Sequence, residues 1–408
     1  MTARFAIPAF AAYGIELEYA IVDAATLDVA PIAQPLLESL RDDSLRRACG
    51  AGWSNEIVSH VVEVKNVQPS PSLAGLPQQF AREVRAANHA LAPHGARLMP
   101  TGMHPWMDPR RETSLWTASD APIYAMYDRL FDCRRHGWSN LQSMHLNLPF
   151  AGDAQFARLH TAIRLVLPLV PALAASSPFA DARATGYRDY RLAVYATNSR
   201  RFPRITGEII PDVVHDRRDY EVSVLAPMYE SVAASDPHGI LRHEWLNSRG
   251  AIARFDRSAI EIRLADTQEC PRADIAVAHA ISMVVRSLFE ERNSSTETQS
   301  AIATERLAAI LRRTIREGEE AWIDDAEFLR ALGVRRHELP AREAWRELLA
   351  GVDADTPRAF EEPLSYVLAH GTLATRILAA CGDAPDRARL RDVYVELCEC
   401  VESGRLFS

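Results

Sequence analysis

Four short segments in which apolar and polar residues alternate constrain the fold of this chain more than any other feature. These segments are GIELEYAIVD (14–23), HVVEVKNV (60–67), MHLNLPF (144–150) and SAIEIRLAD (258–266). Alternation with a period of two, together with β-branched and aromatic residues, predicts strands with one apolar and one polar face. Because the polar face is not covered by apolar helices, the pattern favours a mainly antiparallel sheet over a doubly wound parallel sheet.

Helical patterns between these strands supply the apolar cover for the sheet. Apolar residues recur every three or four positions over residues 76–91 and again over residues 156–170, which is typical of amphipathic helices. The predicted class is therefore α+β, with helices packed on one face of the sheet and a polar, active-site face on the other.

The C-terminal part of the chain is expected to be helical. A long helical pattern ends near residue 292 and is followed by the polar stretch NSSTETQS, which has the composition of a linker. We therefore expect a catalytic domain over residues 1–292, a linker over 293–300 and a helical region over 301–408 that packs on the catalytic domain. No strand-like alternation occurs in this last region.

The polar face of the predicted sheet carries pairs of polar residues at positions i and i+2, which share one face of a strand. The pairs are Glu16 with Glu18, Glu63 with Lys65, His145 with Asn147, and Glu261 with Arg263. Exposure to water explains any single pair most simply. Together they indicate a site, because neighbouring carboxylates repel one another unless a cation lies between them.

Mg²⁺ is the cation that this set of oxygen ligands favours, since it commonly bridges carboxylates to nucleotide phosphates. A carboxylate-lined face with a nearby arginine is therefore a candidate site for Mg-ATP, although the chain has neither a GxxxxGK[ST] nor a GxGxxG motif. The formal net charge of −8 provides no general attraction to nucleic acid.

The localisation expected from the sequence is cytoplasmic. The cysteines form no CxxC pair, no apolar run of about 18 residues suggests a membrane span, and the N-terminal residues lack a signal-peptide pattern. We expect small-molecule substrates and neither a nucleic acid nor a membrane as partner. Whether the chain forms a homo-oligomer stays open.

The motif GIELEY resembles the opening motif of glutamate-cysteine ligases and of related carboxylate-amine ligases with a glutamine synthetase-like fold. The similarity continues, in order, through EIVSHVVE, MHLN, SSPFADARATGYRDYR and AIEIRLAD, and covers roughly residues 13 to 290. The resemblance implies metal ligation by a set of six residues, namely Glu16, Glu18, Glu56, Glu63, His145 and Glu261. It also implies that Arg263 meets the transferred phosphoryl group.

Further assignments follow for residues near these motifs. We assign nucleotide binding to Arg263, Asn147 and Lys65. Arg191 is a candidate catalytic residue, because a guanidinium can clamp a carboxylate or phosphate, although a surface ion pair is the alternative. Glu56 and Glu63 are separated by an odd number of residues, so Glu56 must lie on a turn or past a bulge to reach the same site.

The resemblance implies an ATP- and Mg²⁺-dependent ligase that joins a carboxylate to an amine through an acyl phosphate. Glutamate is the family's usual carboxylate donor. We expect a loop within residues 195–240 to shield that intermediate from water. Three alternatives stay open: a guanidino-type kinase on the same fold, a non-catalytic protein that binds nucleotide or amino acid, and a metallohydrolase. The scarcity of paired histidines on the strands disfavours zinc.

Overall fold

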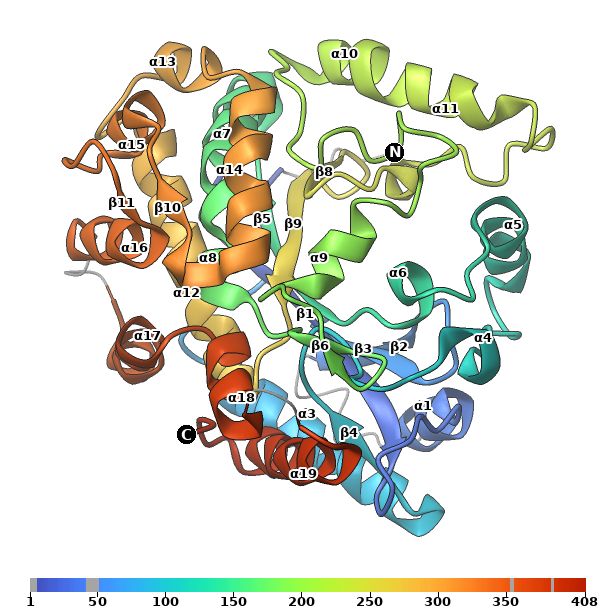
Figure 1. Ribbon diagram of the computed structural model, residues 1–408. Coiled ribbons are helices and arrows are strands. Elements are labelled where there is room, and N and C mark those ends of the chain that lie inside the picture. The colour runs from blue at the N-terminus through green and yellow to red at the C-terminus, as the bar shows by residue number, and fades with distance from the viewer. Residues whose placement is uncertain (1–5, 42–50, 353–355, 383–384) are drawn as a thin grey trace.

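A central antiparallel sheet organises the computed structural model, which describes residues 6–41, 51–352, 356–382 and 385–408. Within these residues the sheet has seven strands in the order β2-β3-β1-β5-β9-β8, and β4 pairs with β1 (Figure 1). The strands are β1 (Gly14–Asp23), β2 (Ala51–Asn55), β3 (Val61–Asn66), β4 (Ala96–Met99), β5 (Ser143–Pro149), β8 (Ala251–Arg254) and β9 (Ala259–Asp266). The four predicted strands correspond to β1, β3, β5 and β9, and the predicted α+β class is confirmed.

The register of the sheet aligns the polar pairs across neighbouring strands. Opposite one another lie Glu16 and Lys65, Glu18 and Glu63, Glu16 and His145, and Asn147 and Glu261. The intervening residues Ile15, Leu17 and Tyr19 are fully buried on the other face. The alternation seen in the sequence therefore separates an apolar face from a polar face.

Amphipathic helices cover the apolar face. Helix α3 (Leu76–Leu91) buries Phe80 and Val84 completely, and it packs against α12 (Pro271–Phe289), which in turn contacts α7 (Gly152–Val166). In Figure 1, α7 and α12 lie on the left of the sheet, whereas α5 (Ala121–Phe131) and α6 (His136–Ser139) lie on its right.

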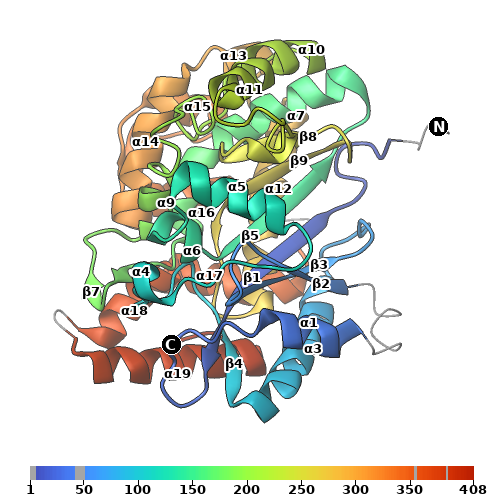
Figure 2. The same cartoon turned by 90° about the vertical axis from the view of Figure 1, so that its right-hand side faces the viewer.

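The C-terminal residues form helices that extend this apolar layer (Figure 2). They are α14 (Thr304–Glu317), α15 (Ala326–Leu332), α16 (Ala341–Ala350), α17 (Arg358–His370), α18 (Leu373–Cys381) and α19 (Arg387–Ser403). Helix α17 packs on α12, and α19 packs on α3 and β4. This part also contains the strand pair β10 (Trp322–Ile323) and β11 (Leu339–Pro340), which was not expected because two residues are too short to establish an alternation.

The polar stretch expected to be a linker contains helix α13 (Thr296–Ser300). Its Gln299 is buried and donates hydrogen bonds from Nε2 to the carbonyls of Leu288, at 3.0 Å, and Ser294, at 2.9 Å. This segment is therefore fastened to α12, and the division of the chain at residues 293–300 stays a prediction.

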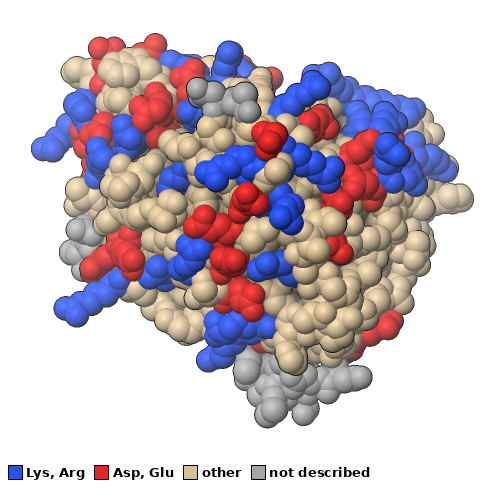
Figure 3. Space-filling model, turned by 60° about the horizontal axis from the view of Figure 1, so that its bottom comes forward, with Lys and Arg blue, Asp and Glu red and all other residues tan. Residues whose placement is uncertain are grey.

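Charges of both signs are interspersed over the middle of the face that Figure 3 brings forward. Among the described residues, no single helix combines the length and apolar composition needed to cross a membrane. Helices α17 and α18 meet those two criteria only as a pair, which is bent by 54°.

Candidate active site

The polar face of the sheet opens into a cavity of about 540 Å³. Nine of the ten residues assigned to the site from the sequence line this cavity, namely Glu16, Glu18, Glu56, Glu63, Lys65, His145, Arg191, Glu261 and Arg263. The tenth, Asn147, is held against the cluster by a hydrogen bond of 3.2 Å from Nδ2 to Oε1 of Glu16. Residues from distant parts of the chain thus converge on one cavity.

Strands β1 and β5 hold one part of the cluster together. The backbone N–H and hydroxyl of Ser143 donate to Oε2 of Glu18 at 2.7 and 3.0 Å. The imidazole of His145 lies 2.9 Å from the Ser143 hydroxyl through Nε2 and 3.4 Å from Oε2 of Glu16 through Nδ1. Burial, with a smaller contribution from Glu63, raises the pKa of Glu18 above its ordinary value.

Glu56 reaches the same cluster from the turn that follows β2, as its spacing from Glu63 requires. Strands β2 and β3 form a hairpin in which Ser54 lies opposite Glu63 and donates a hydrogen bond of 2.9 Å to it. Glu56 follows β2 directly, and its carboxylate lies in one ligand set with those of Glu18 and Glu63. Burial and the carboxylates of Glu18 and Glu63 raise the pKa of Glu56 well above its ordinary value.

Two sets of ligand atoms within this cluster are close enough to share a metal ion. Glu16, Glu63 and His145 form one set, Glu18, Glu56 and Glu63 form the other, and in each set the ligand atoms lie within 4.8 Å of one another. Burial and the neighbouring Glu16 raise the pKa of Glu63 to about 7, against the opposing charge of Lys65. Five carboxylate or imidazole groups in two overlapping sets suit hard divalent cations such as Mg²⁺.

Glu261 lies next to these sets and is paired with arginines. Its Oε1 accepts a hydrogen bond of 2.8 Å from Nε of Arg263, and its Oε2 accepts one of 3.2 Å from Nη1 of Arg254. Although burial opposes the change, Arg263, His145 and Arg254 lower the pKa of Glu261 to about 2. Glu261 therefore orients Arg263, and its role as a metal ligand stays a prediction.

Two further arginines of the cavity were missed by the sequence analysis. Arg254 ends β8, and Arg257 lies in the turn before β9, with Nη1 3.8 Å from Oε1 of Glu16. The segment RFDRS before the last predicted strand has the composition of a short turn. A hairpin inferred from that turn would have brought both arginines back toward Glu261.

Arg191 lies at the start of α9 (Tyr190–Tyr195), and its guanidinium is largely committed to protein partners. Its Nε is paired with Asp266, and its Nη2 donates to the carbonyl of Leu264 at 2.7 Å. The register between β5 and β9 shifts beside this contact, so Arg263 and Leu264 lie opposite the single residue His145. The guanidinium therefore stabilises a β-bulge next to the cavity, and a direct contact with substrate stays a prediction.

Five aromatic residues on helices also line the cavity, and none of them was assigned to the site from the sequence. They are Tyr124, Tyr127, Trp138, Tyr195 and Trp245. Tyr124 and Tyr127 lie on α5, while the other three come from α6, α9 (Tyr190–Tyr195) and the short helix η4 (Glu244–Leu246). No single periodic segment of the sequence therefore groups the five residues.

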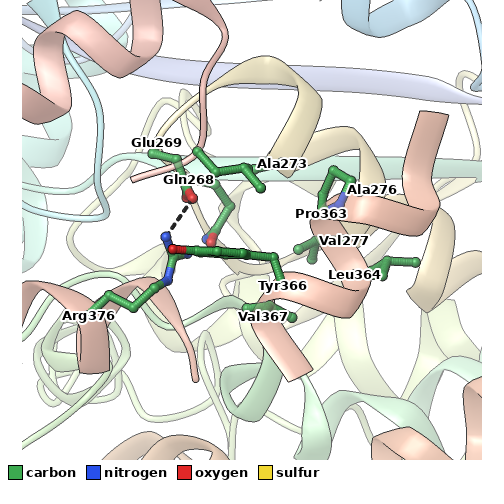
Figure 4. A pocket seen from close by; sticks show the side chains of 11 residues that line it. Gln268, Glu269, Ala273, Ala276, Val277, Pro363, Leu364, Tyr366, Val367 and Arg376 are labelled. Carbon is green, nitrogen blue, oxygen red and sulfur yellow. Dashed lines mark hydrogen bonds and ion pairs between the residues drawn. The ribbon is translucent and has the colours of Figure 1, made fainter. Parts of the chain in front are cut away.

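A second, much smaller cavity lies between the β9–α12 junction and the C-terminal helices (Figure 4). Its volume of about 10 Å³ is about that of one water molecule, which excludes it as a substrate site. The figure shows Arg376 directed at Glu269, and Nη1 of Arg376 donates to Oε1 of that carboxylate at 2.8 Å. This buried ion pair fastens the C-terminal helices to the end of the sheet.

An antiparallel sheet with overlapping ligand sets beside arginines, on a face open to a cavity, is the arrangement expected from the resemblance to carboxylate-amine ligases. The sequence model of "Glutamate-cysteine ligase family 2(GCS2)" matches residues 12–396. The chain therefore belongs to this family, and the resemblance inferred from the GIELEY and later motifs is confirmed.

Individual relatives agree with this membership. An uncharacterised protein of Archaeoglobus fulgidus is 30% identical over 337 residues, which cover 80% of this chain and 89% of the relative. A protein of Bradyrhizobium diazoefficiens named "Putative glutamate--cysteine ligase 2" is 28% identical over 302 residues, which cover 72% of this chain and 64% of the relative. This chain thus matches just under two thirds of that protein's length.

A solved structure shares the fold. The glutamate-cysteine ligase of Francisella tularensis, crystallised in complex with AMP, superposes with a TM-score of 0.59 and 13% sequence identity. The superposition covers 96% of this chain and 89% of the ligase. At this identity the similarity concerns the fold alone.

Proposed function

We propose that this protein is an ATP- and Mg²⁺-dependent ligase that joins an amino-acid carboxylate, with glutamate as the first candidate, to an amine. The observation that carries the proposal is the pair of overlapping ligand sets that share Glu63, placed in one cavity with Arg254, Arg257 and Arg263. Acidic ligands for a divalent cation and arginines for phosphate or carboxylate are the two components that phosphoryl transfer requires.

The chemistry of the ligand set fits Mg²⁺. Burial and mutual repulsion raise the pKa of Glu18, Glu56 and Glu63, which is the behaviour expected of carboxylates arranged around a cation site. When bound, Mg²⁺ would neutralise phosphate charge and help to align the terminal phosphoryl group.

The proposed reaction has two steps. An oxygen of the donor carboxylate attacks the γ-phosphorus of ATP, so that a new O–P bond forms while the bond to ADP breaks. The amine nitrogen then attacks the carbon of the acyl phosphate, an amide C–N bond forms, inorganic phosphate leaves and the nitrogen loses a proton. Charge stabilisation and exclusion of water are the main contributions expected of the protein.

Residues of this chain would divide these tasks. Arg263, oriented by Glu261 at 2.8 Å, would stabilise the charge of the transferred phosphoryl group. Lys65 is paired with Glu63 and Asn147 donates to Glu16, so both would hold ligand carboxylates in place besides any contact with nucleotide. Tyr195 and Asn198, from the segment 195–240 that is expected to shield the intermediate, line the cavity and would limit the access of water.

The experiment that tests the proposal measures ADP release and amide formation by the purified protein with Mg-ATP, glutamate and a panel of amines. Glu63→Gln should abolish amine-dependent turnover, because Glu63 belongs to both ligand sets. The matched control is Glu338→Gln, which changes an exposed glutamate and should leave turnover intact.

Each other outcome has a distinct meaning. ADP and a phosphorylated product without an amide would favour the kinase alternative. Binding of Mg-ATP without turnover for any donor and amine would favour a non-catalytic binding protein.

A further inference from the structure

The cavity has a second kind of lining, which we name the aromatic wall and define as Tyr124, Tyr127, Trp138, Tyr195 and Trp245. These residues line the same cavity as the carboxylates. They come from α5, α6, α9 and the short helix η4 (Glu244–Leu246), and therefore from outside the sheet. The wall is thus structurally separate from the sheet that carries the ligand sets.

Three rings of the wall, those of Tyr127, Trp138 and Trp245, pack together. The ring of Tyr127 is buried and lies 5.3 Å from that of Trp138 and 5.9 Å from that of Trp245, centroid to centroid. The imidazole of His243 stacks on Trp245 at 5.2 Å with an interplanar angle of 13°. Trp138, Trp245, Tyr124 and Tyr195 keep part of their surface exposed, so an apolar ligand in the cavity can bury it.

Charges of both signs line the cavity beside the wall. The hydroxyl of Tyr124 accepts a hydrogen bond of 3.1 Å from Asn55. The carboxylates of Glu56 and Asp120 line the cavity together with Tyr124, and Arg263 lines it together with Tyr195. The cavity beside the wall therefore contains both acidic residues and the arginine expected at the reacting phosphoryl group.

One acidic residue near the wall, Asp120, is outside the two ligand sets and lines the same cavity. Its carboxylate would attract an ammonium group, which can also lie over an aromatic face. A flat aromatic group placed along the wall would gain stacking and burial. A short amine such as cysteine would leave most of the wall in contact with water.

We propose that the aromatic wall binds the apolar body of the acceptor amine, and that the acceptor carries an aromatic ring or a comparably large apolar group. This proposal rests on the ligase function proposed above and assigns the substrate class of the same site.

The test compares amines of matched chemistry, such as phenylalanine with alanine and 2-phenylethylamine with ethylamine, with cysteine included. For the wild type we expect kcat/KM at least tenfold higher for the aromatic member of each pair. Trp245→Ala should lower kcat/KM for aromatic amines by roughly 10–100-fold, the usual value of a large apolar group in a pocket. Trp245→Phe should recover most of this loss, while the KM for ATP stays within about twofold.

Trp322→Ala is the matched control, because Trp322 is an exposed tryptophan on β10 and should leave amine selectivity unchanged. A rise in the KM for ATP in Trp245→Ala, equal for all amines, would assign the wall to the nucleotide base and overturn the proposal. Equal kcat/KM for aromatic and short amines in the wild type would also overturn it.

A binding measurement separates this proposal from the ligase function. Quenching of tryptophan fluorescence by 2-phenylethylamine, with Mg-ADP present, requires no turnover. Saturable quenching that Trp245→Ala weakens at least tenfold would support the aromatic wall as an amine site even if no ligation occurred. Absence of quenching by aromatic amines would overturn the proposal, whether or not the protein ligates other amines.

Discussion

Replacement of Arg191 by methionine distinguishes a guanidinium that holds the backbone from one that contacts substrate. Arg191 is 2% exposed to solvent, and its partner Asp266 is fully buried. Methionine keeps much of the aliphatic volume but removes the guanidinium, while the hydrogen bonds of 2.7 Å that Asp266 accepts from the Ser176 N–H and the Ser177 hydroxyl remain. Loss of one partner of a buried ion pair costs about 3–5 kcal/mol.

The size of this effect sets the expected change in thermal stability. A chain of 408 residues has an unfolding entropy on the order of 0.9 kcal/mol/K, so the melting temperature should fall by roughly 4–6 °C. The carbonyls of Arg263 and Leu264 also lose their donor, so the bulge beside Arg263 should loosen. We therefore expect kcat to fall at least tenfold while the KM for ATP changes little.

Differential scanning calorimetry and steady-state kinetics test this prediction together. Asp266→Asn combined with Arg191→Met should recover part of the lost stability, because the carboxylate that loses its partner is then neutral. Arg183→Met changes an exposed arginine nearby and should have no effect on either readout. An unchanged melting temperature in Arg191→Met, with a large rise in the KM for a substrate, would refute the positioning role and favour direct contact.

Three further predictions concern the carboxylates, a buried histidine and the C-terminal helices. Glu56→Gln should raise the melting temperature in EDTA, because it relieves repulsion among buried carboxylates, but reduce the stabilisation by Mg²⁺; equal Mg²⁺ stabilisation in both proteins would contradict this. Burial, together with the charges of Arg164 and Arg249, lowers the pKa of His160 to about 3. As the pH falls, His160 is therefore protonated in the unfolded state before it is protonated in the folded state. The free energy of unfolding should decrease as the pH falls from about 6.5 toward 3. Urea unfolding across this range should therefore be less pH-dependent for His160→Phe, and an unchanged slope would refute the assignment. Arg376→Met should lower the free energy of unfolding in urea by about 3–5 kcal/mol, because it leaves the buried Glu269 unpaired. Adding Glu269→Gln should restore part of that loss. An unchanged free energy of unfolding in Arg376→Met would contradict the role given to this ion pair.

The geometry around the bulge illustrates how local pattern and tertiary contact contribute separately. The spacing of Glu261 and Arg263 predicts that they share a face, and they do, with a hydrogen bond of 2.8 Å between them. The bulge itself depends on the register between β5 and β9, which pairs residues more than one hundred positions apart. No periodicity within a single strand contains that information.

The sequence by itself determined four of the seven strands of the sheet and the polar face that they share. A period of two places every second side chain on the same side of a strand, so the carboxylates of Glu16, Glu18 and Glu63 follow from local pattern alone. The odd spacing of Glu56 from Glu63 left a turn or a bulge as the ways in which Glu56 could reach the same site. These features are local consequences of backbone geometry, which is why a single sequence is enough to predict them.

Only the tertiary structure decided which groups meet across the cavity. It brought Arg257 to Glu16, paired Arg191 with Asp266, and gathered the aromatic wall from separate elements. Such contacts join residues that are distant in the chain and lie on short helices and turns without a recognisable period. Their positions depend on how whole helices and strands pack against the sheet, and that packing cannot be predicted from local sequence pattern.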